Sequence, residues 1–257
     1  MHRSGTSLLA QWLAQAGLPL TVGGTIAPDV SNQRGYYEDL EFVRLHAAHL
    51  RGIQRRSFGW NYVPSDFLHL DESELAHAHA IIAARNQFHP AWGWKDPRTT
   101  LFLTDWKKVI PSLKVILVWR PCAEVVFSLI TRGLQQRARR LLIGPLQAIR
   151  LWRIYNQLAC DYKMRFPDDT VIVSSSQLPE HSDVVWDRLT TQFGLDLSPV
   201  SAKDWFVPSL MHHQPSRGLQ WLCERLGCGP IEKQLQALSV WNPLASSYCN
   251  RRAQSRR

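Results

Sequence analysis

The sequence is poor in the features that mark membrane, secreted and metal-binding proteins. It has no run of about 18 apolar residues, so no transmembrane helix is predicted. Its five cysteines are odd in number and lack paired metal-ligand spacing, so neither a zinc site nor a disulfide framework is expected. The first residues have the composition of a loop rather than of a signal peptide. We therefore expect reduced thiols, no bound metal and a cytoplasmic protein. A targeting or membrane segment upstream of Met1 is an open alternative.

The sequence also lacks low-complexity stretches, internal repeats and nucleic-acid-binding signatures. Hydrophobic residues make up 45% of the 257 residues and charged residues 20%, as in an ordinary globular protein, and we expect one domain over residues 1–257. The net charge of +9 favours anionic ligands, but without a nucleic-acid-binding motif no nucleic-acid partner is expected. Part of this charge lies in two arginine-rich segments, residues 137–140 and the tail at 251–257.

Apolar periodicity predicts the order of the secondary structure. Continuous apolar runs predict buried strands at residues 114–119 and 170–174, and residues 91–95 are predicted to form a short strand. Spacing of about 3.6 residues predicts helices between and around them, at residues 7–16, 38–51, 71–87, 99–109, 123–131, 145–166 and 182–193. Strands that alternate with helices predict an α/β fold with a parallel sheet flanked by helices.

A short basic loop, Arg3–Ser7, precedes the first predicted helix. Its small residues allow backbone N–H groups to converge on an anion, and the helix N-terminus adds a partial positive charge. The loop therefore predicts a phosphate-like ligand. Such loops normally follow a buried strand, and the residues before His2 are too few to form one. We expect that the natural protein begins upstream of Met1, or that this chain is truncated and impaired.

Two further basic signals follow predicted strands. Lys95–Arg98 comes directly after the first, and Arg120 ends the second, with Ser128 about two helical turns farther along. In parallel α/β folds, ligands bind at the carboxyl ends of strands. We expect these groups and the Arg3–Ser7 loop to converge on one polyanionic ligand.

On these residues the sequence resembles the sulfotransferase superfamily, enzymes that use 3′-phosphoadenosine 5′-phosphosulfate (PAPS). Residues 2–7 (HRSGTS) look like the family's 5′-phosphosulfate loop in its bacterial and carbohydrate-type form, and residues 118–121 (VWRP) with Ser128 look like its 3′-phosphate motif. Residues 32–39 and 93–98 resemble linking segments of bacterial members, and residues 205–210 show a weaker resemblance to the family. The resemblance spans residues 2–132, and residues 133–257 are expected to be a helical region with one strand.

The resemblance implies a P-loop-like three-layer domain and a set of nucleotide contacts. Arg3, Ser4, Gly5, Thr6 and Ser7 would hold the sulfuryl-bearing phosphate. Arg120 and Ser128 would hold the 3′-phosphate, a role that suits a guanidinium because it can bond two phosphate oxygens at once. PAPS would be the co-substrate, and the scheme needs no metal. The sulfuryl group would pass to a hydroxyl or amine of a carbohydrate or small metabolite.

The catalytic base departs from the pattern of cytosolic family members. They place a histidine two residues after the lysine that Lys95 would represent, and Pro97 stands there in this chain. Carbohydrate-type members use a glutamate after the first helix, a position that Glu38 occupies, with Asp39 and Asp96 as further carboxylates. Glu38, Lys95 and Arg3 are therefore the predicted catalytic residues, with Glu38 as base and Lys95 stabilising the bridging oxygen.

Other readings of these residues remain open. Glu38 and Asp39 also suit the first turn of a helix, Lys95 and Arg98 could form salt bridges, and Arg120 could form a structural ion pair. A P-loop nucleotide kinase is the second functional hypothesis, although the loop lacks the Gly-Lys-Ser/Thr of such enzymes. A truncated, inactive nucleotide-binding protein is the third. The acceptor and the oligomeric state have no signal in the sequence.

Overall fold

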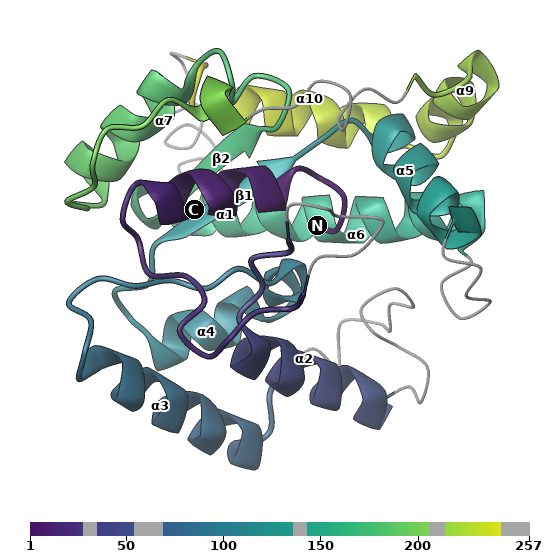
Figure 1. The fold of residues 1–257 in the computed structure, drawn as a ribbon. Coiled ribbons are helices and arrows are strands. Elements are labelled where there is room, and N and C mark those ends of the chain that lie inside the picture. The colour runs from purple at the N-terminus through teal and green to yellow at the C-terminus, as the bar shows by residue number, and fades with distance from the viewer. Residues whose placement is uncertain (28–34, 54–68, 136–142, 206–213, 243–257) are drawn as a thin grey trace, which may run out of the picture.

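The computed structural model describes residues 1–27, 35–53, 69–135, 143–205 and 214–242, which form a mainly helical fold with a small parallel sheet (Figure 1). The strands are β1 (Val115–Trp119) and β2 (Thr170–Ser174). The α-helices are α1 (Thr6–Gln15), α2 (Leu40–Ile53), α3 (Glu72–Asn86), α4 (Leu103–Val109), α5 (Cys122–Gln135), α6 (Pro145–Arg165), α7 (Ser182–Asp187), α9 (Arg217–Arg225) and α10 (Cys228–Leu238).

The sheet pairs β1 with β2 in parallel, from Val115 opposite Thr170 to Trp119 opposite Ser174. Both strands are the continuous apolar runs of the sequence, and every residue of β2 is buried. The chain passes from β1 through α5 and α6 before it returns as β2, the kind of long connection that parallel strands need. The predictions of strands at 114–119 and 170–174 are confirmed.

Helices cover the sheet through two separate apolar clusters. Leu117 and Ile172 pack in one cluster with Trp152 of α6. Val118 and Val173 pack in the other, which contains residues of α1 and α7. Because successive strand residues point to opposite faces, the two clusters lie on opposite sides of the sheet. This arrangement is compatible with the predicted α/β class.

The predicted strand at residues 91–95 is wrong. These residues form no ladder with a strand, and a single backbone bond from Gly93 N–H to Pro19 O, 2.9 Å long, ties them to the segment after α1. Trp92 and Trp94 instead pack with Phe42 of α2 in an aromatic group, and the Trp94 and Phe42 rings are stacked 4.3 Å apart. The apolar character that predicted a strand comes from side chains that fill space between helices.

The predicted helices are found, two of them in altered form. The helix predicted at 99–109 begins as a 3₁₀ turn, Pro97–Phe102, before it becomes α4, and the one predicted at 182–193 continues from α7 as a π turn, Arg188–Gln192. α3 begins at a capping box in which Asp71 and Glu74 accept each other's backbone N–H. In Figure 1, α2, α3 and α4 lie together on one side of α1, and α7 and α10 lie on the other.

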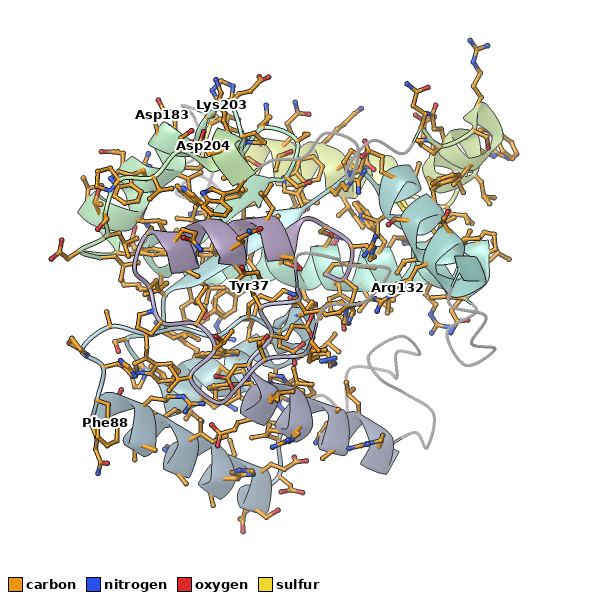
Figure 2. All side chains as sticks on the ribbon, viewed as in Figure 1. Tyr37, Phe88, Arg132, Asp183, Lys203 and Asp204 are labelled. Carbon is orange, nitrogen blue, oxygen red and sulfur yellow. The ribbon has the colours of Figure 1, made fainter. Side chains whose placement is uncertain are left out.

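Several features singled out in the sequence lie outside the described residues. They are residues 32–34 of the first linking segment, the arginines at 137–140, residues 206–210 and the tail at 251–257. Within the described residues, no helix is both long enough and apolar enough to cross a bilayer. Among the residues with described side chains, the most exposed large apolar one is Phe88, 77% exposed just after α3 (Figure 2).

Candidate functional site

The loop Arg3–Ser7, here called the anion loop, turns sharply into α1. Gly5 is the N-cap residue of that helix with φ of 85°, and Arg3 has φ of 62°. The first N–H groups of a helix have no acceptor within the helix, so this end of α1 can bind an anion. Ser4 is fully buried, and its hydroxyl has no hydrogen-bond partner among the residues that the structure describes. A buried donor without an acceptor is the feature that an anionic ligand would satisfy.

Arg3 reaches from the anion loop to the second predicted phosphate motif. Its Nε donates to Ser128 Oγ on α5 over 2.9 Å. Ser128 is buried, with 2% of its surface exposed. The structure thus brings together two of the groups that the sequence predicted to share a ligand.

Arg120 is buried at the carboxyl end of β1. Its Nε donates to Glu124 Oε2 over 2.6 Å, one turn along α5, and its carbonyl accepts from the Trp152 indole over 2.9 Å. The ion pair with Glu124 is the structural role that the sequence had left open for Arg120. The Arg120 guanidinium therefore lies at the end of β1, next to the start of α5, and forms an ion pair with the Glu124 carboxylate.

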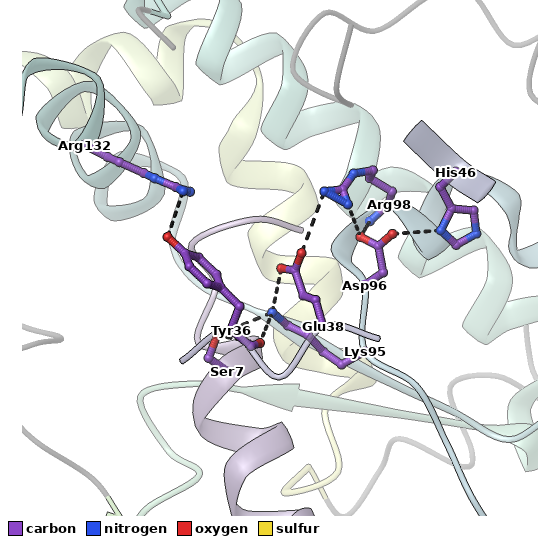
Figure 3. A network of polar contacts seen from close by, with 8 residues as sticks. All are labelled: Ser7, Tyr36, Glu38, His46, Lys95, Asp96, Arg98 and Arg132. Atoms are coloured by element: carbon purple, nitrogen blue, oxygen red, sulfur yellow. Dashed lines mark hydrogen bonds and ion pairs between the residues drawn. The ribbon is translucent and has the colours of Figure 1, made fainter. Parts of the chain in front are cut away.

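Lys95 and Glu38, two of the predicted catalytic residues, are in contact beside the anion loop (Figure 3). Lys95 Nζ donates to Glu38 Oε1 over 2.8 Å, to the Tyr36 carbonyl over 2.8 Å and to Ser7 Oγ over 3.4 Å. Burial lowers the pKa of Lys95, and the Arg98 charge adds to this effect, whereas Glu38 opposes it. Glu38 lies just before α2, so these contacts join the start of that helix to the anion loop.

Behind this pair lies a buried chain of polar groups that ends at His46. Arg98 lies 3.7 Å from Glu38 Oε2 and donates to Asp96 Oδ1 over 2.9 Å. His46 Nδ1 lies 2.8 Å from Asp96 Oδ2, and its Nε2 accepts from the Trp106 indole over 2.9 Å. Because the indole can only donate, His46 carries its proton on Nδ1 and donates to Asp96.

Arg98 and His46 stabilise the negative charge of the Asp96 carboxylate. Burial would raise the pKa of the Asp96 carboxyl, but the guanidinium of Arg98 and the hydrogen bond from His46 more than offset this, and the pKa lies well below its usual range. Asp96 also accepts the Arg98 backbone N–H over 3.0 Å as the cap of the 3₁₀ turn. Asp96 therefore acts as an ionised anchor for Arg98.

The three candidate bases have different surroundings. Asp39 is buried, accepts from Gly23 N–H over 3.0 Å and pairs with Arg85 over 3.1 Å. Asp96 is enclosed by Arg98 and His46. Among the three, Glu38 is the carboxylate in contact with Lys95 and thereby with the anion loop.

Tyr36 links the network to α5. Its hydroxyl accepts from Arg132 over 3.0 Å, and the Arg132 guanidinium lies 5.6 Å from the ring centroid (Figure 3). Arg132 follows Ser128 by one helical turn on α5, so both side chains lie on one face of that helix.

Tyr37, the residue after Tyr36, has φ of 53°. Among the described residues, Tyr37 and Arg3 are the only ones other than glycine with a positive φ. Backbone strain of this kind gathers at functional sites.

His46, Tyr36 and Arg132 were not identified as site residues from the sequence. The signal for His46 is its position on the apolar face of α2, four residues after the buried Phe42. The signal for Arg132 is its spacing from Ser128. In the part of the chain that the structure describes, no three His, Cys, Asp or Glu side chains gather as metal ligands would.

Comparison with known proteins adds no family assignment: no protein-family model, curated protein or solved structure matches this chain. The geometry and the sequence motifs are therefore the basis for a functional proposal. The arrangement combines a helix N-terminus and arginine side chains suited to phosphate groups with a carboxylate–ammonium pair suited to proton transfer and charge stabilisation.

Proposed function

We propose that this protein transfers a sulfuryl group from PAPS to a hydroxyl or amine of an acceptor. The observation that carries the proposal is the 2.9 Å contact between Arg3 and Ser128. It places the loop that resembles a 5′-phosphosulfate site against the serine that resembles part of a 3′-phosphate site. A ligand with phosphate groups at both its 3′ and 5′ positions would contact both segments.

In this proposal the nucleotide is held from two sides. Backbone N–H groups of Ser4–Ser7, the buried Ser4 hydroxyl and Arg3 bind the 5′-phosphosulfate. Arg120 and Ser128 bind the 3′-phosphate, and Arg120 exchanges its contact with Glu124 for the ligand. The two-stranded sheet with helices on both faces supports a further part of the proposal, that the chain has the P-loop-like three-layer domain of sulfotransferases.

The chemical step uses the pair next to the anion loop. The Glu38 carboxylate accepts the proton of the acceptor hydroxyl while the oxygen of that hydroxyl attacks the sulfur atom of PAPS. The bond between sulfur and the bridging phosphate oxygen breaks, and Lys95 stabilises the negative charge that develops on that oxygen. The products are the sulfated acceptor and adenosine 3′,5′-bisphosphate. We propose a carbohydrate or small hydroxylated metabolite as the acceptor.

Isothermal titration calorimetry with adenosine 3′,5′-bisphosphate tests the nucleotide half of the proposal. We expect binding that Arg120→Ala weakens by about a hundredfold, the loss of a charge-assisted contact of roughly 2.7 kcal/mol. Arg188→Ala, which removes an exposed arginine far from these motifs in the sequence, is the control and should bind as the unmodified chain does. A preference for ATP with magnesium would contradict the proposal and favour a nucleotide kinase.

Labelled PAPS and a panel of hydroxylated acceptors test the catalytic half. Transfer of label to at least one acceptor supports a sulfotransferase. Tight binding of adenosine 3′,5′-bisphosphate without transfer to any member of the panel would favour an inactive nucleotide-binding protein.

A further inference from the structure

Cysteine residues that play no part in the proposed reaction gather where three helices meet. Cys122 is the first residue of α5, Cys228 is the first residue of α10, and Cys223 lies on α9. The sulfur atoms of Cys122 and Cys228 are 3.2 Å apart, and all three thiols are buried and unoxidised. Residues 106 positions apart in the chain are thus placed with their sulfur atoms in contact.

We propose that Cys122 and Cys228 are an oxidation site at which a hydroperoxide forms a disulfide between α5 and α10, with Cys223 assisting. The site is independent of the proposed sulfuryl transfer. Its sulfur atoms need to approach by about 1.2 Å to reach the S–S bond length, a movement within the range of side-chain adjustment.

The surroundings of the cluster favour a thiolate at Cys223. α5 begins at Cys122 and α10 at Cys228, and the partial positive charge of a helix N-terminus favours an anion nearby. Hydrogen bonds from the Cys122 and Cys228 thiols lower the pKa of Cys223 to about 4. The hydrogen bonds with Cys223 and Cys228 raise the pKa of Cys122. The bond with Cys122 lowers the pKa of Cys228, but the bond with Cys223 and burial outweigh it and raise that pKa to about 12. One negative charge shared by three sulfur atoms makes the cluster more nucleophilic than a lone buried thiol.

Access to the cluster comes through α9. Cys223 is the one buried residue of that helix, Leu219 and Leu222 are partly buried against the core, and Trp221 is 61% exposed. A helix of nine residues with one buried side chain opens locally at a lower cost than global unfolding. Opening of α9 would expose the sulfur atoms to a small peroxide.

The oxidation balances in three steps. The Cys223 thiolate attacks the O–O bond of the hydroperoxide, forming a sulfenic acid and, with a proton taken from the cluster or from water, releasing water or an alcohol. The Cys122 thiol attacks the sulfenic sulfur, which forms a disulfide with Cys223 and releases water. Cys228 then attacks the Cys122 sulfur, which forms the disulfide between α5 and α10 and displaces Cys223 as its thiolate. Two thiols lose two electrons in total, and the peroxide bond accepts them.

Peptide mapping by mass spectrometry tests the site in the folded protein. The chain is treated with hydrogen peroxide, its remaining thiols are alkylated after denaturation, and the digest is searched for cross-linked peptides. We expect one cross-link that joins Cys122 to Cys228, reversible by dithiothreitol, while Cys160, which is buried elsewhere, stays alkylatable. The proposal would be overturned if Cys122 and Cys228 were alkylated as completely as Cys160 after peroxide treatment. It would also be overturned if Cys122 were cross-linked to Cys223 only.

Variants separate oxidation from folding effects. Cys228→Ser should abolish the cross-link, Cys160→Ser should leave it intact, and Cys223→Ser should slow its formation by about tenfold because the thiolate is less favoured. Circular dichroism checks that each variant is folded before oxidation. Unchanged oxidation of Cys223→Ser would overturn its assisting role, and the mapping of the unmodified chain tests the disulfide itself without any substitution.

Discussion

Arg3 donates its Nε–H to Ser128 Oγ over 2.9 Å, across 125 residues of sequence. Arg3 belongs to the loop before α1 and Ser128 to the helix after β1, so the bond joins the two segments that would bind the opposite ends of a nucleotide bisphosphate. Arg3 holds a backbone conformation with φ of 62°, which an arginine rarely adopts without compensation from its surroundings. The contact with Ser128 provides part of that compensation.

Removal of the Ser128 hydroxyl should weaken nucleotide binding more than it weakens the fold. Ser128→Ala deletes one donor to the proposed 3′-phosphate, and we expect about a tenfold rise in the Kd for adenosine 3′,5′-bisphosphate, which corresponds to about 1.4 kcal/mol. Calorimetry measures the change. Thr131→Ala is the matched control, because its hydroxyl bonds to the Phe127 carbonyl of the same helix. Equal effects of the two variants would show that Ser128 acts only through the helix.

Loss of the Glu38 charge should slow sulfuryl transfer. Glu38→Gln keeps the shape of the side chain but removes the proposed base, and we expect kcat to fall by about 10²–10⁴-fold with little change in the affinity for adenosine 3′,5′-bisphosphate. Glu41→Gln is the control, since Glu41 also lies near the start of α2 but pairs with Arg85. If Glu38→Gln retains the unmodified rate and Asp96→Asn abolishes it, the base is Asp96.

Lys95 should act on the same step in a different way. Lys95→Met removes the ammonium that contacts Ser7, Tyr36 and Glu38, and we expect kcat to fall by about 10²-fold because charge on the bridging oxygen is no longer stabilised. Single-turnover transfer from labelled PAPS measures the effect. Lys107→Met is the control, because Lys107 pairs with Asp169 outside this network. A loss of PAPS affinity with an unchanged rate of transfer would assign Lys95 to binding alone.

Stability should decline in acid through Asp96. Because its pKa in the folded chain lies below the usual value, the ionised carboxylate contributes its full stabilisation above about pH 4, and this is lost as the pH falls from there through the folded pKa. Urea unfolding between pH 2 and 7 measures the loss. Asp96→Asn should destabilise the chain by about 3–5 kcal/mol at neutral pH and flatten the acid dependence, because it leaves buried Arg98 without its anchor.

Asp169 provides the matched control for Asp96. Its pKa is also lowered, by hydrogen bonds from Lys107 and Lys114, but its side chain is 27% exposed. Asp169→Asn should therefore cost only about 0–1 kcal/mol. A similar loss for both variants would mean that burial around Asp96 adds nothing to the strength of its contacts.

The parallel sheet should be sensitive to the loss of buried side-chain volume. Ile172→Ala, in the middle of β2 and 1% exposed, should lower the free energy of unfolding by about 2–5 kcal/mol. Leu146→Ala, at a site that is 64% exposed on α6, should change it by about 0.5 kcal/mol or less. Thermal or urea unfolding compares the two. Comparable losses would indicate that β2 does not lie in the core.

Much of the secondary structure could be predicted because its signals are local. The apolar runs at 114–119 and 170–174 and the helical spacing at 7–16 and 145–166 each depend on neighbours within one element, and all are found in the structure. The prediction at residues 91–95 failed because two tryptophans can fill an aromatic cluster as readily as a strand. Their packing against Phe42 depends on α2, which lies far away in the sequence.

For the candidate site too, some features could be predicted from the sequence and others could not. The residue types and their positions were enough to predict which groups suit an anion, namely the small residues and arginine of the anion loop, Lys95, and Arg120 with Ser128. Their partners became known from the folded chain: Arg3 with Ser128, Lys95 with Glu38, Arg120 with Glu124, and Asp96 with His46. Periodicity and capping act within a few residues, whereas burial and charge pairing depend on segments that meet only when the chain folds.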